Sequence, residues 1–333
     1  MHAPDGFLTA PTALATGIVS AGAIAGAVRA SRPALDDDRI PLAGVTAAFI
    51  FAAQMVNFPV AAGTTGHLIG AALAAVLLGP SLAMLVVAIV VAVQALVFAD
   101  GGLTALGYNV LNMAIVPTLG GWAVFVGTQR LLRRSSRAVA VSAGIAGFAS
   151  VVLSAAAFSL EWLVGASVAV PFDRVVTAMV GVHVLIGIGE AVITAAVVAA
   201  VMAVRVDLVA GAQRYGDRLD LPRGGGRRVA LAGLVAALAI GAGVAQFAVD
   251  APDGLERVAQ DLGFAESGQP HPFASSLFSE YATQGIASPS LSLAVAGVAG
   301  TLLTATVGTG VVLLIRDRPR RDTQRSEPSN RAG

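Results

Sequence analysis

Long apolar stretches follow one another along most of the sequence, and no other feature limits the possible folds as strongly. Apolar residues make up 56% of the 333 residues and charged residues only 12%. A stretch of about 17–25 apolar residues crosses the hydrocarbon core of a membrane as an α-helix. Alternating strands separated by turns, which would indicate an outer-membrane barrel, do not occur. The sequence therefore predicts an all-α fold, a polytopic transmembrane helical bundle of about seven helices followed by two more. The nine expected spans lie near residues 9–28, 41–60, 64–79, 81–99, 103–127, 138–164, 175–204, 228–249 and 290–315.

The basic residues predict how these spans are oriented. All 21 are arginines, and all except Arg174 and Arg257 lie in alternate connections between the spans. Basic residues concentrate in cytoplasmic loops, so we expect a multi-pass protein of the cytoplasmic (inner) cell membrane, with its N-terminus outside and its C-terminus inside. No basic region precedes the first apolar stretch, where Asp5 lies instead, so we expect no cleaved signal peptide and a free α-amine on Met1.

A histidine at the second position allows this amine to take part in metal chelation. The Met1 amine, the His2 backbone nitrogen and the near ring nitrogen of His2 can close two fused chelate rings on one metal ion. Three nitrogens in one plane suit Ni(II) and Cu(II) and can hold Co(II), whereas Zn(II) prefers a tetrahedron and Mg(II) and Ca(II) prefer oxygen. Chance alone also places histidines at position 2, so the hypothesis needs a further ligand.

His67 is the predicted fourth nitrogen ligand. It begins the third expected span, on the same side of the membrane as Met1. Asn57, Thr64 and Thr65 are expected to hydrogen-bond the ring nitrogen that faces away from the metal. The alternative is that His67 is a helix cap or an interfacial residue.

Two asparagines form a polar patch at one end of the fifth expected span. Asn109 and Asn112 are three residues apart and share one helical face. Amides inside a membrane need partners. They either brace the loop that carries His67 or make hydrogen bonds between helices unrelated to a ligand.

His183 and Glu190 are an intramembrane polar pair, seven residues apart on one helical face. Ionisable residues at such positions are costly and indicate function by default. We expect a structural polar contact across the bundle, and a proton relay is the alternative.

Small residues form a stripe on the first expected span. Such residues let two helix backbones approach closely, either inside the bundle or at a docking face for another membrane subunit. The candidate docking residues are Ala21, Gly22, Ala25 and Gly26.

Several functions are disfavoured by missing motifs. The sequence has no cysteine, no phosphate-binding G-x-x-x-x-G-K-[ST] loop, no H-E-x-x-H helix and no G-x-S-x-G elbow. We therefore expect a protein that is not an enzyme, carries no cofactor and has no nucleic-acid partner.

Four separated motifs resemble the CbiM/NikM substrate-capture subunits of cobalt and nickel energy-coupling-factor transporters. They are Met1–Leu8, Gly63–Leu68, Gly101–Gly107 with Asn109–Met113, and Ile186–Ala191. The resemblance covers residues 1–204. A further segment, Pro252–Ala259, resembles the PDGLE segment of the small accessory subunit (CbiN/NikN-like). The expected organisation is a capture domain at 1–204, a cytoplasmic linker at 205–228, an accessory domain of two spans and an outer loop at 229–315, and a disordered cytoplasmic tail at 316–333.

This resemblance implies the function and the partners. It implies a substrate-specific component that captures extracellular Ni(II) or Co(II) through Met1, His2 and His67 for an ATP-driven importer. The partners would be a transmembrane coupling subunit, cytoplasmic ATPases and membrane lipid. The loop from Asp250 to Pro289 is expected to rest on the metal entrance and promote loading. An ion-coupled secondary metal carrier and a non-transporting metal-binding scaffold are the alternatives, and the residues do not separate nickel from cobalt.

Overall fold

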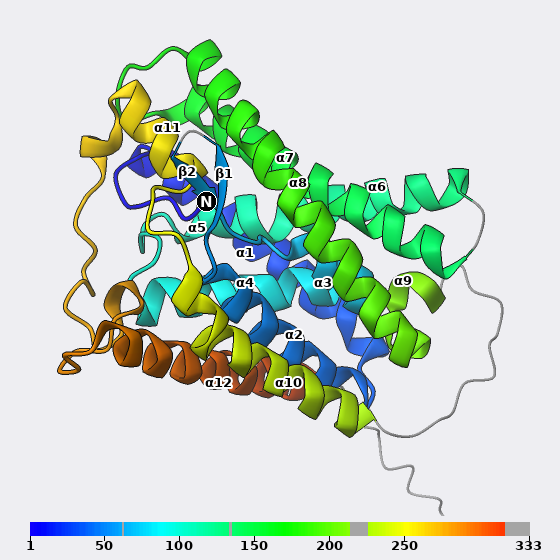
Figure 1. Cartoon of the computed structure of the whole chain (residues 1–333). Helices are drawn as coiled ribbons and strands as arrows, with labels where there is room; N and C mark the ends of the chain where they lie inside the picture. The colour runs from blue at the N-terminus through cyan, green and yellow to red at the C-terminus, as the bar shows by residue number, and fades with distance from the viewer. Residues whose placement is uncertain (62, 133–134, 214–225, 317–333) are drawn as a thin grey trace, which may run out of the picture.

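The chain folds into a bundle of long helices, as the computed structural model in Figure 1 shows for all residues except 62, 133–134, 214–225 and 317–333. The prediction of an all-α polytopic bundle is confirmed. Seven helical segments in the described part of the chain are long and apolar enough to cross a membrane. Four of them are the single helices α1 (Ala10–Ser31), α4 (Pro80–Val97), α7 (Ser136–Gly165) and α8 (Phe172–Val204), and a fifth is α12 (Pro289–Ile315). The segment Leu106–Leu131 consists of α5 (Leu106–Val110), η2 (Leu111–Ile115) and α6 (Val116–Leu131). The segment Arg228–Phe247 belongs to α10 (Gly226–Ala242) and η4 (Val244–Phe247).

The second and third expected spans differ from the other seven. The second becomes α2 (Arg39–Gln54), which ends before a short hairpin of β1 (Phe58–Ala61) and β2 (Thr64–Gly66). The third is not one helix, because after β2 the chain runs irregularly to α3 (Ala71–Leu78). Eight residues of helix measure only about 12 Å. Irregular backbone is tolerated at membrane depth where protein covers it, and every residue of α3 is buried.

The irregular stretch before α3 has its backbone groups paired with side chains. Glu190 on α8 accepts hydrogen bonds from the amides of Ile69, at 2.7 Å, and Gly70, at 2.8 Å. Gln54 donates to the Ile69 carbonyl at 3.0 Å. Gly70 has a φ of +77°, which favours glycine. These contacts satisfy polar groups that would otherwise be unpaired away from water.

The predicted linker at 205–228 is partly folded against the bundle. Its first residues form η3 (Val206–Leu208) and α9 (Ala210–Gln213). Leu208, Val209 and Ala212 are buried in the hydrophobic core. Residues 214–225 of the predicted linker and 317–333 of the predicted tail lie outside the described residues, and α10 begins at Gly226.

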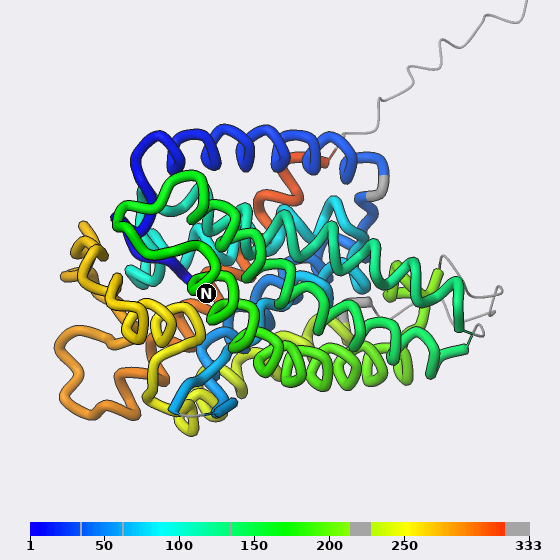
Figure 2. The backbone as a smooth tube through the Cα atoms, turned by 90° about the horizontal axis from the view of Figure 1, so that it is seen from above, coloured from blue at the N-terminus to red at the C-terminus, as the bar shows by residue number. Residues whose placement is uncertain are grey.

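The C-terminal helices pack along α2 on one side of the bundle (Figure 1). Ala237 of α10 is fully buried against Ala48 and Ala52 of α2. Between α10 and α12 the chain crosses one end of the bundle and forms α11 (Gly254–Leu262) near the N-terminus. Helix α1 lies along an edge of the molecule, as Figure 2 shows from above.

Candidate metal centre

The first residues of the chain return into the bundle and are fixed there by Asn109. The Ala3 amide donates to Asn109 Oδ1 at 2.9 Å, and Asn109 Nδ2 donates to the Ala3 carbonyl at 2.9 Å. The Gly102 amide also donates to the Ala3 carbonyl, at 3.0 Å. Both polar backbone groups of Ala3 are therefore paired, which holds Met1 and His2 in place.

Asp5 provides a second anchor for the N-terminal segment. Its buried carboxylate accepts hydrogen bonds from the amides of Leu103, Thr104 and Ala105, at 3.1, 2.7 and 3.0 Å, and from the Thr104 hydroxyl at 2.6 Å. These groups lie where α5 begins, so Asp5 satisfies amides that have no partner within a helix. The sequence had identified Asp5 only as an argument against a signal peptide.

The structure brings Met1 and His67 together. The Met1 nitrogen lies 2.8 Å from Nε2 of His67. Two adjacent nitrogens around a metal in a square plane, each bonded at about 2.0 Å, are themselves about 2.8 Å apart. His67 Nδ1 donates to the Leu68 carbonyl at 3.1 Å, which leaves the lone pair on Nε2. The predicted hydrogen bonds to Nδ1 from Asn57, Thr64 or Thr65 are therefore replaced by one to Leu68.

His2 stacks on His67, with the ring centroids 5.3 Å apart and the planes 22° from parallel. His2 Nε2 lies 3.0 Å from Gln94 Oε1, within hydrogen-bond distance, while Nδ1 is the nitrogen needed for chelation. Nδ1 lies 3.3 Å from Asp100 Oδ1. Burial lowers the pKa of His2 to about 4, although Asp100 opposes this shift. The His2 backbone nitrogen makes no hydrogen bond within the described part of the chain.

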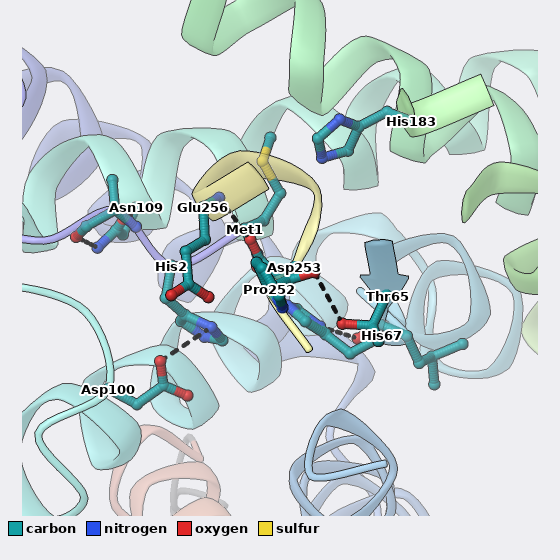
Figure 3. Close-up of polar contacts among 12 residues, drawn as sticks. Met1, His2, Thr65, His67, Asp100, Asn109, His183, Pro252, Asp253 and Glu256 are labelled. Carbon is teal, nitrogen blue, oxygen red and sulfur yellow. Dashed lines mark hydrogen bonds and ion pairs between the residues drawn. The ribbon is translucent and has the colours of Figure 1, made fainter. Parts of the chain in front are cut away.

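Asp253 is the site residue that the sequence did not identify. Its carboxylate makes an ion pair with the Met1 ammonium, and Oδ2 lies 3.6 Å from His67 Nε2 (Figure 3). Burial alone would raise the pKa of Asp253, but the Met1 ammonium and His67 hold it well below its usual range. Asp253 belongs to the recognised PDGLE segment, but nothing in that segment indicated a contact with Met1.

Two of the residues predicted to support His67 instead bind the segment that precedes α11. The Thr65 amide donates to the Pro252 carbonyl at 2.9 Å, and its hydroxyl donates to the Ala251 carbonyl at 2.9 Å. The Asn57 carbonyl accepts from the Val249 amide at 3.0 Å. Thr64 is buried, and its side chain makes no hydrogen bond with another described residue.

Asn109 and Asn112 have different roles despite their common face. Asn112 Nδ2 donates to Oε2 of Glu161 on α7 at 2.6 Å, and the Asn112 backbone carbonyl accepts from the Ser154 hydroxyl. Asn112 therefore fits the alternative of hydrogen bonding between helices, while Asn109 holds the N-terminal segment.

His183 and Glu190 do not contact each other through a hydrogen bond. His183 Nδ1 donates to the Met179 carbonyl at 2.7 Å, and Glu190 binds the backbone before α3. The expected polar contact across the bundle is thus made by Glu190 with Ile69 and Gly70. His183 lies beside the Met1 side chain (Figure 3) and lines a small cavity with Met1 and Asp253.

A larger cavity of about 680 Å³ is lined by His2, His67 and Asp253, and we call it the vestibule. It lies between residues of the N-terminal part of the chain and residues 245–293, and His2 and His67 both line it. Its acidic lining residues are Asp100, Asp250, Asp253, Glu256 and Glu280. Acidic walls around a cavity attract cations.

No group of three or more His, Asp or Glu side chains with metal-site geometry occurs among the residues that the structure describes. A metal site at this position would therefore depend on the Met1 amine and the His2 backbone nitrogen. The predicted docking residues Ala21, Gly22, Ala25 and Gly26 are exposed on α1. A Cβ atom added at Gly22 or Gly26 would meet nothing within 4 Å.

Comparison with protein families gives two matches along the chain. Residues 2–208 match the model of the cobalt uptake substrate-specific transmembrane region (CbiM), and residues 227–317 match the PDGLE domain.

Similar proteins include transporters and a solved structure. A protein of Archaeoglobus fulgidus that bears the name of a fused nickel transport protein, NikMN, is 34% identical over 310 residues, which are 92% of this chain and 97% of that protein. The cobalt transport protein CbiM of Geobacter sulfurreducens is 33% identical over 175 residues, or 51% of this chain and 49% of that protein. The crystal structure of a transition metal transporter is 30% identical with a TM-score of 0.56, covering 61% of this chain and 93% of that one.

Proposed function

Because the chain belongs to the CbiM family of cobalt uptake transmembrane proteins and carries a PDGLE domain, we propose that it is the substrate-specific component of an energy-coupling-factor importer. In this role it captures extracellular Ni(II) or Co(II) for ATP-driven delivery across the cytoplasmic membrane. The relatives named above are transporters of these metals, which supports a transport subunit rather than an enzyme.

The observation that carries the proposal is the approach of the Met1 amine to His67 Nε2, with the His2 ring stacked alongside. We propose that the metal is bound by the Met1 amine, the backbone and Nδ1 nitrogens of His2, and His67 Nε2. Four nitrogens in this arrangement favour Ni(II) and accept Co(II), and they exclude Mg(II) and Ca(II), which need oxygen ligands.

The N-terminal segment is held ready for this chemistry. Asn109 and Asp5 fix the residues that follow His2, so little conformational entropy remains to be lost on binding. The metal must displace one proton from the Met1 ammonium and one from the His2 backbone amide, and the His2 Nδ1 must exchange its contact with Asp100 for the metal.

Transport requires partners in this proposal. The sequence has no phosphate-binding loop, so ATP hydrolysis would occur in separate cytoplasmic ATPases. A transmembrane coupling subunit would dock on the exposed small-residue stripe of α1, defined by Ala21, Gly22, Ala25 and Gly26. The arginine distribution supports an outward N-terminus, which puts the vestibule on the outer side.

Uptake of nickel and cobalt in cells lacking their own importers tests this function. We expect uptake when the chain is expressed with a coupling subunit and ATPases, and its loss when the ATPases are inactive. Uptake independent of ATPases would instead indicate a secondary carrier, and binding without uptake under any condition would indicate a scaffold. Analysis of metal bound after growth in both metals identifies the preferred one.

A further inference from the structure

We propose that Asp253 is the first protein ligand of the incoming metal ion and transfers it from the vestibule to the nitrogen ligands. The inference rests on the proposed capture function, and it concerns how the metal is loaded. Asp253 comes from the C-terminal PDGLE domain, yet its carboxylate contacts the predicted metal ligands of the N-terminal domain.

The position of Asp253 between two cavities is the first argument. The vestibule and the small cavity at Met1 share His67 and Asp253 in their walls. Asp253 is the acidic residue that reaches both. A cation that moves from the vestibule into the small cavity therefore meets the Asp253 carboxylate in both walls.

The second argument is that the two carboxylate oxygens of Asp253 have different tasks. Oδ1 accepts a hydrogen bond from the Glu256 amide at 2.9 Å and caps the N-terminus of α11. Oδ2 faces the Met1 nitrogen and lies 3.6 Å from His67 Nε2. One oxygen fixes the side chain while the other faces the ligand atoms, as a monodentate metal ligand requires.

The surrounding backbone holds Asp253 at this point. Thr65, two residues from His67, binds the Pro252 carbonyl through its amide at 2.9 Å. On the other side, Gly254 packs directly on α8, because a Cβ there would lie 2.8 Å from Ile186 and 3.0 Å from His183. The carboxylate is thus positioned from both sides rather than carried on a free loop.

The charges that face the Asp253 carboxylate indicate that it passes the metal ion on and does not block the site. In the structure the carboxylate faces the single positive charge of the Met1 ammonium. An arriving divalent ion has twice this charge, so its attraction to the carboxylate is stronger than that of the ammonium it displaces. The carboxylate oxygen replaces one water of the hydrated ion, and the Met1 nitrogen then binds as its proton leaves to vestibule water. The His2 backbone nitrogen binds as its amide proton leaves in the same way, and His2 Nδ1 and His67 Nε2 complete the plane.

Stopped-flow absorbance of Ni(II) binding to the full chain tests the inference. Asp253→Asn keeps an N-cap but removes the anionic oxygen. We expect its association and dissociation rates both to fall by about tenfold or more, with the dissociation constant within about threefold of the wild type, because a transfer ligand lowers the barrier in both directions.

Two matched variants distinguish ligation of the metal by Asp253 from electrostatic attraction of the ion by the acidic residues around it. Glu256→Gln removes an equal charge from the vestibule wall and should slow association by no more than about threefold, as expected for a charge that only steers the ion. Asp261→Asn removes a charge from the same helix, where Asp261 pairs with Arg257, and should leave both rates unchanged. Thermal unfolding confirms that each variant folds.

Association of the Asp253→Asn variant within about threefold of the wild type would overturn the inference, as would equal slowing by Glu256→Gln. Faster association would identify a plug and overturn it too. These outcomes leave the proposed function intact, which fails only if the wild-type chain binds neither Ni(II) nor Co(II).

Discussion

Replacement of Asn109 by alanine should weaken metal binding without touching a metal ligand. Asn109 makes two hydrogen bonds of 2.9 Å to the Ala3 backbone. Without Asn109 the Ala3 carbonyl still accepts from the Gly102 amide, but the buried Ala3 amide is left unpaired, which costs about 1–3 kcal/mol unless the segment leaves its place in the bundle. Since a released segment does not bind metal, the apparent affinity falls with the fraction that stays in place. A loss of about 1–3 kcal/mol corresponds to about 5- to 140-fold weaker binding.

Isothermal titration calorimetry of Ni(II) binding measures this loss, and Asn112→Ala is the matched control. Asn112 lies one turn away but bonds Glu161 rather than the N-terminal segment. We expect Asn112→Ala to lower the unfolding temperature and to leave the dissociation constant within about threefold of the wild type. The reasoning is refuted if Asn109→Ala binds as tightly as the wild type, or if both variants lose affinity equally.

Three further predictions concern pH, the backbone before α3 and the chain start. Nickel affinity should fall on acidification because binding displaces the Met1 ammonium proton. His2 stays neutral over most of the range because burial lowers its pKa to about 4. Calorimetry between about pH 5 and 8 checks this prediction, and constant affinity contradicts it. Glu190→Ala leaves the amides of Ile69 and Gly70 unpaired and should lower the free energy of unfolding by about 2–6 kcal/mol. Glu190→Gln should have an intermediate effect, and unchanged thermal unfolding in detergent would argue against a stabilising role for Glu190. Acetylation of the Met1 amine, the sole primary amine in a sequence without lysine, should abolish nickel binding, so an acetylated protein with unchanged affinity by calorimetry is incompatible with the site.

Apolar runs in the sequence predicted the bundle, but they did not distinguish lipid-facing spans from a buried short helix. Residues 64–79 are as apolar as a span, yet they form a strand, an irregular stretch and α3. The difference depends on Glu190 of α8 and Gln54 of α2, which pair with the buried backbone groups of Ile69 and Gly70. Such pairing involves residues distant in sequence and leaves no local periodic signal.

In the candidate site, too, the sequence did not specify contacts between residues that are distant along the chain. Proximity of Met1 and His67 followed from a shared membrane side and matching chemistry, and the structure brings them to 2.8 Å. Asn109 and Asn112 share one helical face, so only their packing partners separate the residue that holds the chain start from the one that joins two helices. Asp253 contacts Met1 although the two are 252 residues apart, and the sequence between them specifies no such contact.

X-ray absorption spectroscopy of the nickel-loaded full chain tests the central claim most directly. Coordination by the Met1 amine, the two His2 nitrogens and His67 predicts four nitrogen ligands in a plane, with scattering from two imidazole rings, and the loss of one ring in His67→Ala. Six ligands with oxygen in the majority, or a spectrum that His67→Ala leaves unchanged, would contradict the account.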